Sequence, residues 1–243
     1  MPVCKKTYDF ISHTQPSLPY PAPITLPHYT TESTDVLLLT CGIVPAKKRE
    51  ESVDGIEMDM AVSAISRHTI LKAASPRLPP HARVLIWGFP GSKGYYKQTN
   101  LKDFNSETSY TGGFGTPHMN TVALNEALVH HWSKNGLSIS GYNPGLIRSG
   151  IRDSMHGGPL AYLGTLMESM IALFNPSADE YATKILPLLT APELMTPAFN
   201  GLFFNQSGQP IKGAPEFNDP SIVSQWIKAA DDLVKKADSK RQV

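Results

Sequence analysis

The sequence predicts an α/β fold, a Rossmann-like parallel sheet flanked by helices. Short apolar runs such as 35–39 and 83–87 alternate with longer segments in which apolar residues recur at helical spacing. Loops rich in glycine and proline follow the apolar runs. With 243 residues, of which 41% are hydrophobic and 18% charged, the chain is long enough to bury one sizeable core.

Residues 1–34 differ in composition from the rest of the chain. Prolines 16, 19, 21, 23 and 27 stand among tyrosine and histidine, a composition typical of extended polyproline-like chain. This Pro-rich arm is predicted to be either a disordered tail or a segment packed on the body. Residues 35–243 are predicted to form a single α/β domain.

The first strand is predicted at Asp35–Leu39, because an uninterrupted apolar run is typical of a buried parallel strand. A helix is predicted over Val53–Ser75 from apolar residues at helical spacing, and three prolines close it. The second strand is predicted at Arg83–Trp87, with a glycine-rich loop through Gly94 after it.

A long helix is predicted to begin near Thr116, an N-cap candidate, with Pro117 at the first helical position and Gly136 as its stop. The strand Leu137–Tyr142 follows and ends in an Asn-Pro-Gly turn at 143–145. A helix that leads into a strand and a loop is half of a βαβ unit. Ligands of open α/β sheets bind at such C-terminal strand ends.

The C-terminal third is predicted to contain three helices and one strand. Leu160–Phe174 has apolar residues on one helical face, and residues 177–180 have the S-x-x-E form of a capping box. A strand is predicted at Gly201–Phe204, and Asp219–Ser221 caps the last helix. Leu160–Phe174 is the most apolar segment, but at 15 residues with one Glu it is too short and too polar to span a bilayer.

Composition argues against several classes of function. A net charge of +1 with dispersed Lys and Arg disfavours nucleic acid or an anionic membrane as the main partner. Two cysteines cannot form a disulfide framework or a metal site by themselves, so we expect a reducing, cytoplasmic setting and no metal. No apolar region follows Lys5–Lys6, so no secretory signal is expected.

Four short motifs occur in order. They are D-V-L-L-L-T-C-G-I at 35–43, R-V-L-I-W-G-F at 83–89, F-G-T-P-H at 114–118 and P-G-L-I-R-S at 144–149. From Asp35 to about Ala237 their order and spacing resemble the short-chain dehydrogenase/reductase family, most closely its retinol-dehydrogenase-like group. There the corresponding motifs are D-V-L-V-N-N-A-G-I, R-I-V-N-V-S-S, Y-G-x-S-K and the P-G-x-x-x-T turn that borders the nicotinamide.

The residues that carry the family's chemistry are replaced. The family uses a Tyr as general acid/base, a Lys that lowers the pKa of this Tyr, a Ser that holds the substrate oxygen and an Asn in a proton relay. On the ungapped alignment these positions are Phe114, His118, Phe89 and Ser63. A second register would place His118 on the Tyr and Val122 on the Lys. Either way the Tyr-x-x-x-Lys pair is missing.

The resemblance also implies a cofactor site that is retained only in part. The family's Gly-rich turn precedes the strand that corresponds to Asp35–Leu39, whereas the first glycine here is Gly42. Two βαβ units need roughly 60 residues, and only 34 precede Asp35. The N-terminal nucleotide-binding half is therefore predicted to be truncated or replaced. Gly42, Pro144, Gly145 and Ser149 are the remnant cofactor-binding candidates; we expect no cofactor, or NADP if the family activity is retained.

Without that half, the Asp35–Leu39 strand would lie at an edge of the sheet. An apolar edge strand promotes aggregation unless another segment covers it. The 1–34 arm or a second subunit is predicted to do so, and a homo-oligomer is expected.

His118 is the candidate acid/base, since an imidazole titrates near neutral pH, and Ser63 is a candidate source of a hydroxyl, as are Thr40, Ser92 and Ser149. Phe114, at the Tyr position, has no proton to give. The substrate-binding candidates are two tyrosines in the loop after the second strand and two residues of the apolar Leu160–Phe174 helix, which matches the segment that covers the substrate site in the family: Tyr95, Tyr96, Leu163 and Met167. The alternatives are an exposed first-turn histidine and an ordinary core helix.

Three hypotheses for function follow. The first is an enzyme that acts on a small apolar metabolite in a secondary-metabolite pathway, by non-standard, cofactor-free acid/base chemistry. The second is an NADP-dependent oxidoreductase with a rearranged site. The third is a non-catalytic pseudoenzyme or binding protein.

Overall fold

The fold is built on a five-stranded sheet. A computed structural model describes residues 34–91, 94–147, 175–191, 196 and 199–241. The chain divides after Glu32 into two units, and the fold is that of the second, Ser33–Val243. Its strands follow the order β1-β2-β3-β4-β5. Their bounds are Val36–Leu39, Arg83–Trp87, Ser138–Tyr142, Phe203–Phe204 and Pro210–Ile211. The first four strands run parallel and β5 is antiparallel to β4, which confirms the predicted fold class.

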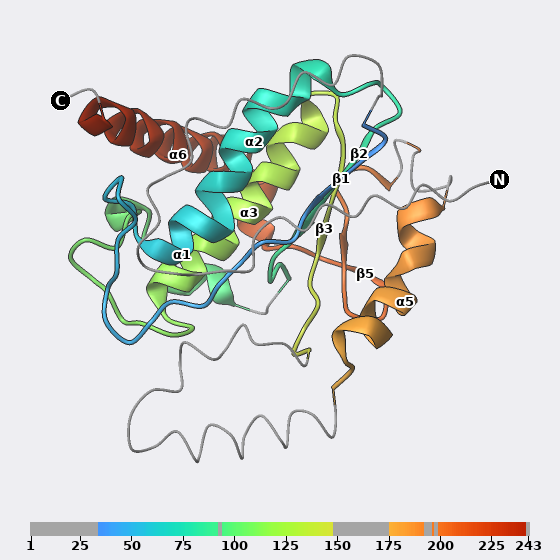
Figure 1. Cartoon of the computed structure of the whole chain (residues 1–243), viewed down its shortest axis with the longest axis horizontal. Helices are drawn as coiled ribbons and strands as arrows, with labels where there is room; N and C mark the ends of the chain where they lie inside the picture. Colours follow the sequence, from blue (N-terminus) through green and yellow to red (C-terminus); the bar gives the residue numbers. More distant parts are fainter. Residues whose placement is uncertain (1–33, 92–93, 148–174, 192–195, 197–198, 242–243) are drawn as a thin grey trace. The chain divides into compact units, whose positions relative to one another are not determined.

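Helices cover both faces of this sheet (Figure 1). On one face lie α1 (Met58–Met60), the π-helical segment η1 (Ala61–Ile65), α2 (Ser66–Ala74) and α3 (Thr116–Lys134), with α6 (Pro220–Arg241) packed on α3. α5 (Ala178–Thr190) lies on the opposite face. The short 3-10 turns are Ser75–Arg77, Tyr95–Gln98, Leu101–Asp103 and Pro215–Asn218. Within the described residues, no helix is long and apolar enough to cross a membrane.

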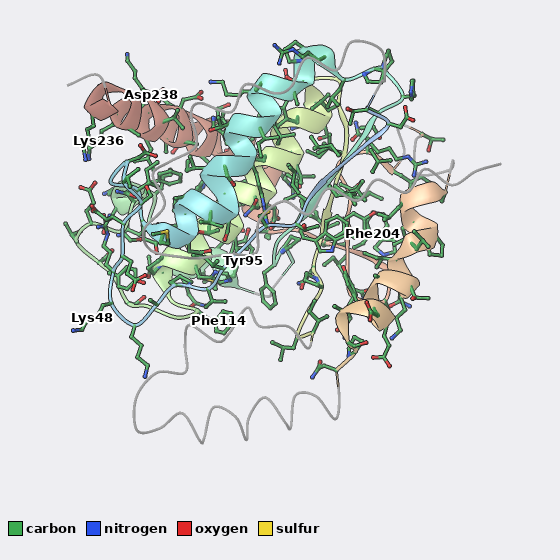
Figure 2. The ribbon with its side chains drawn as sticks, in the orientation of Figure 1. Lys48, Tyr95, Phe114, Phe204, Lys236 and Asp238 are labelled. Carbon is green, nitrogen blue, oxygen red and sulfur yellow. The ribbon has the colours of Figure 1, made fainter. Side chains whose placement is uncertain are left out.

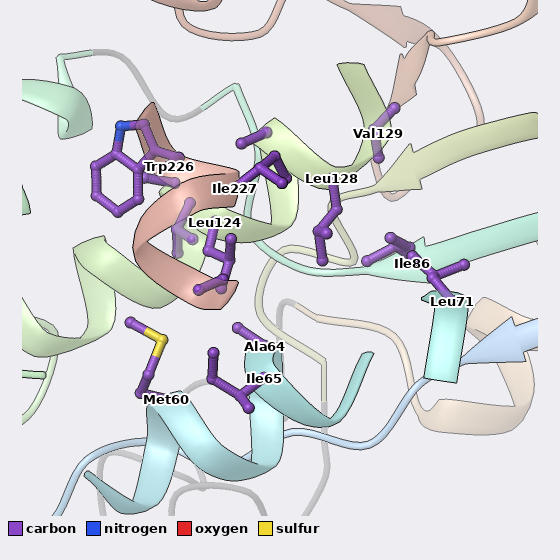
Figure 3. Packing of buried hydrophobic residues seen from close by; sticks show 14 of the residues in the cluster. Met60, Ala64, Ile65, Leu71, Ile86, Leu124, Leu128, Val129, Trp226 and Ile227 are labelled. Atoms are coloured by element: carbon purple, nitrogen blue, oxygen red, sulfur yellow. The ribbon is translucent and has the colours of Figure 1, made fainter. Parts of the chain in front are cut away.

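The strands divide their side chains between two hydrophobic clusters, because successive residues of a strand point to opposite faces. Val84 and Ile86 of β2 join the larger cluster, where residues of α3 meet Trp226 and Ile227 of α6 (Figure 3). Leu85 joins the smaller cluster with Tyr142 and Phe204 on the α5 side; Figure 2 labels Phe204 there. The larger cluster fixes α3, and α3 carries much of the candidate site.

β1 is an edge strand within the described part of the chain, where it pairs with β2 alone. Leu39 is buried in the larger cluster, whereas Val36 and Leu38 are 41% and 44% exposed. The prediction of an edge position agrees with this strand order. The prediction of a buried strand is wrong for the side that carries Val36 and Leu38, because both side chains remain exposed.

Several element bounds match the sequence prediction, and others differ for local reasons. β2 has the predicted bounds, and the Ser177 capping box at the start of α5 is present. The helix predicted from Val53 begins only at Met58, because Glu57 caps it and Gly55 adopts a positive φ of 73° in the preceding turn. α3 starts at Thr116 with Gly115 as its N-cap. The predicted Leu160–Phe174 helix lies outside the described residues.

Candidate active site

A cavity of about 660 Å³ opens at the C-terminal ends of β1, β2 and β3. The loops after these strands form one side of it, the first turns of α3 and the helix η1 a second, and α5 a third. The ionisable side chains among the lining residues are those of Arg67, His118 and Tyr181, and most of the others are apolar. The cavity therefore lies where ligands of open α/β sheets bind, and its lining suits an apolar molecule.

His118 projects from the first turns of α3 onto the cavity wall and is paired with a buried carboxylate. Its Nδ1 lies 2.9 Å from Oδ2 of Asp59, which belongs to α1 and has no exposed side-chain surface. The His118 side chain is 12% exposed, so the alternative of an exposed first-turn histidine is wrong. With Nδ1 engaged by the carboxylate, Nε2 is the ring nitrogen left for a ligand. A carboxylate in this position orients an imidazole and stabilises its protonated form.

Ser63 holds the carboxylate from the other side. Its Oγ donates to Oδ1 of Asp59 over 2.5 Å and accepts from the backbone N–H of Ile43 over 2.9 Å. Ser63 lies four residues after Asp59 in the π-helical segment η1, a helix type frequent at functional sites. Because its proton is directed at Asp59, Ser63 is placed to position the carboxylate and to fix the loop after β1.

Arg67 is a second buried group behind the cavity wall. Its guanidinium donates to Oδ1 of Asn125 over 2.8 Å and to the carbonyl of Cys41, while its Nε has no partner within the described part of the chain. Burial lowers the pKa of Arg67 to about 10, and the nearby charge of Asp59 opposes this shift, so Arg67 remains a cation at neutral pH. Asn125 also donates to the carbonyl of Ser63 over 2.9 Å, which ties α3 to η1.

Phe114 and the Pro144–Gly145 turn also line the cavity. The Phe114 ring meets the His118 imidazole edge-on at 5.3 Å between centroids and is 44% exposed. Asn143 holds the turn through its side chain, which donates to the carbonyl of Pro90 over 2.7 Å and accepts from Gly145 N–H over 2.9 Å. The turn after β3 is thus tied to the loop after β2.

The wall on the α5 side consists mainly of apolar side chains. The indole Nε1 of Trp87 donates to the Tyr181 hydroxyl over 3.0 Å, and the Trp87 ring stacks on Tyr142 at 4.8 Å. Burial raises the pKa of Tyr181 to about 12, so its hydroxyl stays protonated at neutral pH. Ala182, Ile185, Leu186 and Leu189 of α5 complete this wall.

The structure brings together some predicted site residues and separates others. His118, Ser63, Phe114, Gly42, Pro144 and Gly145 all line the one cavity. Tyr95 and Tyr96 are not among its lining residues, and their assignment to the substrate is corrected. The Tyr95 hydroxyl donates to Glu126 over 2.7 Å in the interior, and the Tyr96 hydroxyl accepts from Trp226 Nε1 over 3.1 Å. Both tyrosines were predicted to bind the substrate because they lie in the loop after β2. This loop folds back onto α3 and α6 instead. Ser149, Leu163 and Met167 lie outside the described residues.

The described residues do not fit the diphosphate of a dinucleotide in the usual way. That group binds where a Gly-rich turn leads from a strand into a helix N-terminus. Gly42 and Gly88, which follow β1 and β2 in the cavity lining, lead into loops instead. Only Gly42, Pro144 and Gly145 of the expected remnant are present at the cavity.

Sequence reasoning missed Asp59, Arg67 and Asn125. A signal was available for Asp59, because its spacing of four residues to Ser63 places both on one helical face. The pairing of Asp59 with His118 crosses 59 residues and had no local signal. Within the described residues there is no cluster of three or more His, Cys, Asp or Glu side chains suited to a metal ion.

Comparisons with known proteins indicate a relationship to oxidoreductases. No protein-family model matches the chain. The chain is 32% identical over 210 residues to the uncharacterized oxidoreductase YKL107W of Saccharomyces cerevisiae (strain ATCC 204508 / S288c), an alignment that covers 83% of this chain. It spans 65% of the length of that relative.

Solved structures are also similar to this chain. An uncharacterized protein from Mycobacterium Paratuberculosis has a TM-score of 0.57 at 15% identity, over 85% of this chain and 69% of that one. A short-chain dehydrogenase from Burkholderia cenocepacia J2315 in complex with NADP has a TM-score of 0.46 at 16% identity, over 76% of this chain and 66% of that one. At 15% identity the likeness to the Mycobacterium Paratuberculosis protein concerns the fold alone.

Proposed function

We propose that this chain, a short-chain-dehydrogenase/reductase-like protein, is an enzyme that transfers protons on a small apolar carbonyl compound. The observation that carries the proposal is the His118–Asp59 pair, 2.9 Å apart, at the wall of a largely apolar cavity. A histidine within reach of a bound molecule and oriented by a buried carboxylate is the usual arrangement of a general acid/base.

The proposed step is proton abstraction next to a carbonyl group. Nε2 of His118 takes the proton from the α-carbon, the C–H electron pair forms a C=C bond, and the carbonyl oxygen becomes an enolate oxygen. The imidazolium formed is stabilised by the Asp59 carboxylate. Return of the proton to the same carbon gives exchange, and its return to another carbon of the conjugated system gives an isomer. Neither outcome changes the oxidation state of the whole molecule.

The other cavity residues support this chemistry in distinct ways. Ser63 and Asn125 hold Asp59 and Arg67 in place, so the pair is preorganised before a ligand enters. Phe114 shields one edge of the imidazole. The buried Arg67 cation lies among the lining residues and favours the negative charge that develops on the enolate oxygen.

A cofactor-free exchange assay tests the proposal. The purified chain is incubated with 2-tetralone in D2O, and the loss of the α-proton signals is followed by NMR. We expect exchange above the buffer rate, and a decrease of about 10² or more in the His118→Gln variant. The matched control is His81→Gln, which changes an exposed histidine. Equal rates for the His118→Gln variant and the unchanged chain would rule out the proposed role of His118.

A second candidate function is an NADP-dependent oxidoreductase with a rearranged site. It is supported by the sequence relationship to a yeast oxidoreductase and by Gly42, Pro144 and Gly145 at the cavity. Calorimetric titration with NADPH tests it. Micromolar binding would favour this candidate, whereas no binding at millimolar NADPH would remove it. Absence of both exchange and NADPH binding would leave the pseudoenzyme hypothesis. The secondary-metabolite pathway, the homo-oligomer, the cytoplasmic location and the 1–34/35–243 division stay predictions.

A further inference from the structure

The cavity has two chemically different ends. The polar end contains His118, Arg67, Ser63 and Asn125, which belong to one hydrogen-bonded assembly around Asp59. The apolar end extends to the inner face of α5. Its lining comprises Leu38 of β1, Trp87 at the end of β2 and five residues of α5: Tyr181, Ala182, Ile185, Leu186 and Leu189.

Among the described residues, the lining of the apolar end offers few polar side-chain atoms to a ligand. Its two polar side chains are those of Trp87 and Tyr181. The indole N–H of Trp87 donates to the Tyr181 hydroxyl oxygen over 3.0 Å, which leaves the hydroxyl proton as a donor for a ligand. Tyr181 and Ile185 are buried, so this part of α5 is held firmly against the sheet. Leu38 and Leu186 are partly exposed at its rim, which leaves the apolar surface accessible from solvent.

We infer that the apolar end is a binding site for the tail of the substrate, and that the substrate class is a carbonyl compound with a long apolar chain. This inference rests on the proposed function, which places the carbonyl at His118. Continuity of the two ends in one cavity of about 660 Å³ allows a single molecule to occupy both. The polar end, with a cation and an imidazole, suits an oxygen-bearing head. The other end, with aliphatic and aromatic side chains, suits a hydrocarbon tail.

The length of the tail should determine affinity. Each buried methylene contributes free energy that corresponds to about fourfold in the dissociation constant. For the straight-chain methyl ketones 2-butanone, 2-hexanone, 2-octanone and 2-decanone, measured by calorimetry on the full chain, we expect the dissociation constant to fall steadily with chain length. A dissociation constant that does not change along the series would overturn the inference.

A variant that fills the apolar end locates the effect. Ala182 is exposed and lines the cavity, so Ala182→Phe adds a ring there without disturbing the buried face of α5. We expect 2-decanone to bind about tenfold or more weakly, and 2-butanone to bind as before. The matched control is Thr183→Phe, which adds the same ring to the next residue, exposed and outside the lining. A length dependence that survives in the Ala182→Phe variant would contradict the inference.

Two further measurements keep the inference testable. If the Ala182→Phe chain does not fold, Leu186→Asp places a charge at the exposed rim of the same end and should weaken 2-decanone selectively. Measuring both α-proton exchange and the dependence of binding on chain length separates the inference from the proposed function. Retained length dependence without α-proton exchange in the unchanged chain would contradict acid/base catalysis but leave the tail site intact. Exchange without length dependence would contradict the tail site but leave acid/base catalysis intact.

Discussion

Asp59 and His118 are 59 residues apart in the chain, yet Oδ2 of the first lies 2.9 Å from Nδ1 of the second. The carboxylate is completely buried, and its second oxygen accepts from Ser63. Two helices that pack against each other, α1 and α3, bring the pair together. This relationship gives the cavity an oriented imidazole.

Replacing Asp59 tests whether the carboxylate positions the imidazole. Asp59→Asn keeps an acceptor for Ser63 but removes the charge that stabilises the imidazolium. We expect the kcat of α-proton exchange to fall by about 10²-fold with little change in KM, because the charge acts in the transition state. The control is Asp232→Asn, an exposed residue of α6 paired with Lys228. A change confined to KM would contradict this role.

Glu126 should make stability depend on pH in the acid range. Burial raises its pKa above 4.5, although bonds from Tyr95 and from the backbone N–H of Ala214 and Gly91 oppose the shift. Because the folded chain then binds the proton more tightly than the unfolded chain, its stabilisation is present below pH 4.5 and is lost as pH rises through the folded pKa. Urea unfolding from pH 4 to 8 should show Glu126→Gln gaining stability relative to the unchanged chain as pH rises. A constant difference would refute this.

His130 should act in the opposite direction. Burial lowers its pKa to about 4, with a smaller effect from Lys134, and its ring stacks against Phe217. The unfolded chain takes up a proton near pH 6.5 whereas the folded chain does not, so the stabilisation is present above pH 6.5 and is lost as pH falls towards 4.

His130→Phe retains an aromatic ring and removes this dependence. Between pH 7 and 4.5 the unfolding free energy of the unchanged chain should decline relative to that of the variant by up to about 3 kcal/mol. His81→Phe, at an exposed site, is the control. NMR titration of the His130 ring gives an independent check, and a midpoint near 6.5 would contradict the prediction.

The larger hydrophobic cluster should carry much of the stability. Leu128 of α3 is fully buried among residues of α6 and the sheet (Figure 3). Leu128→Ala should lower the free energy of unfolding by about 2–5 kcal/mol, from lost transfer energy and the cavity left behind. Leu186→Ala, at a position 57% exposed, should change it by about 0.5 kcal/mol or less. Equal losses in chemical denaturation would show that the packing differs from that described.

Elements with a strong local pattern could be predicted from the sequence. β2 is an apolar run between turn residues, and α5 begins at a capping box whose two hydrogen bonds join residues three apart. The predicted start of the first helix is wrong by five residues, because the spacing of apolar residues does not reveal the turn at Gly55. β5 was not predicted, since a two-residue strand exists only through its pairing with β4.

The sequence by itself determined the α/β class and the positions of most of the described strands and helices. These follow from periodicity and from residue identity, which are local. Only the tertiary structure decided that Asp59 orients His118, that Tyr95 bonds to Glu126 in the interior and that α5 closes the apolar end of the cavity. Such relationships depend on how helices and loops pack, and packing joins residues whose separation along the chain carries no signal.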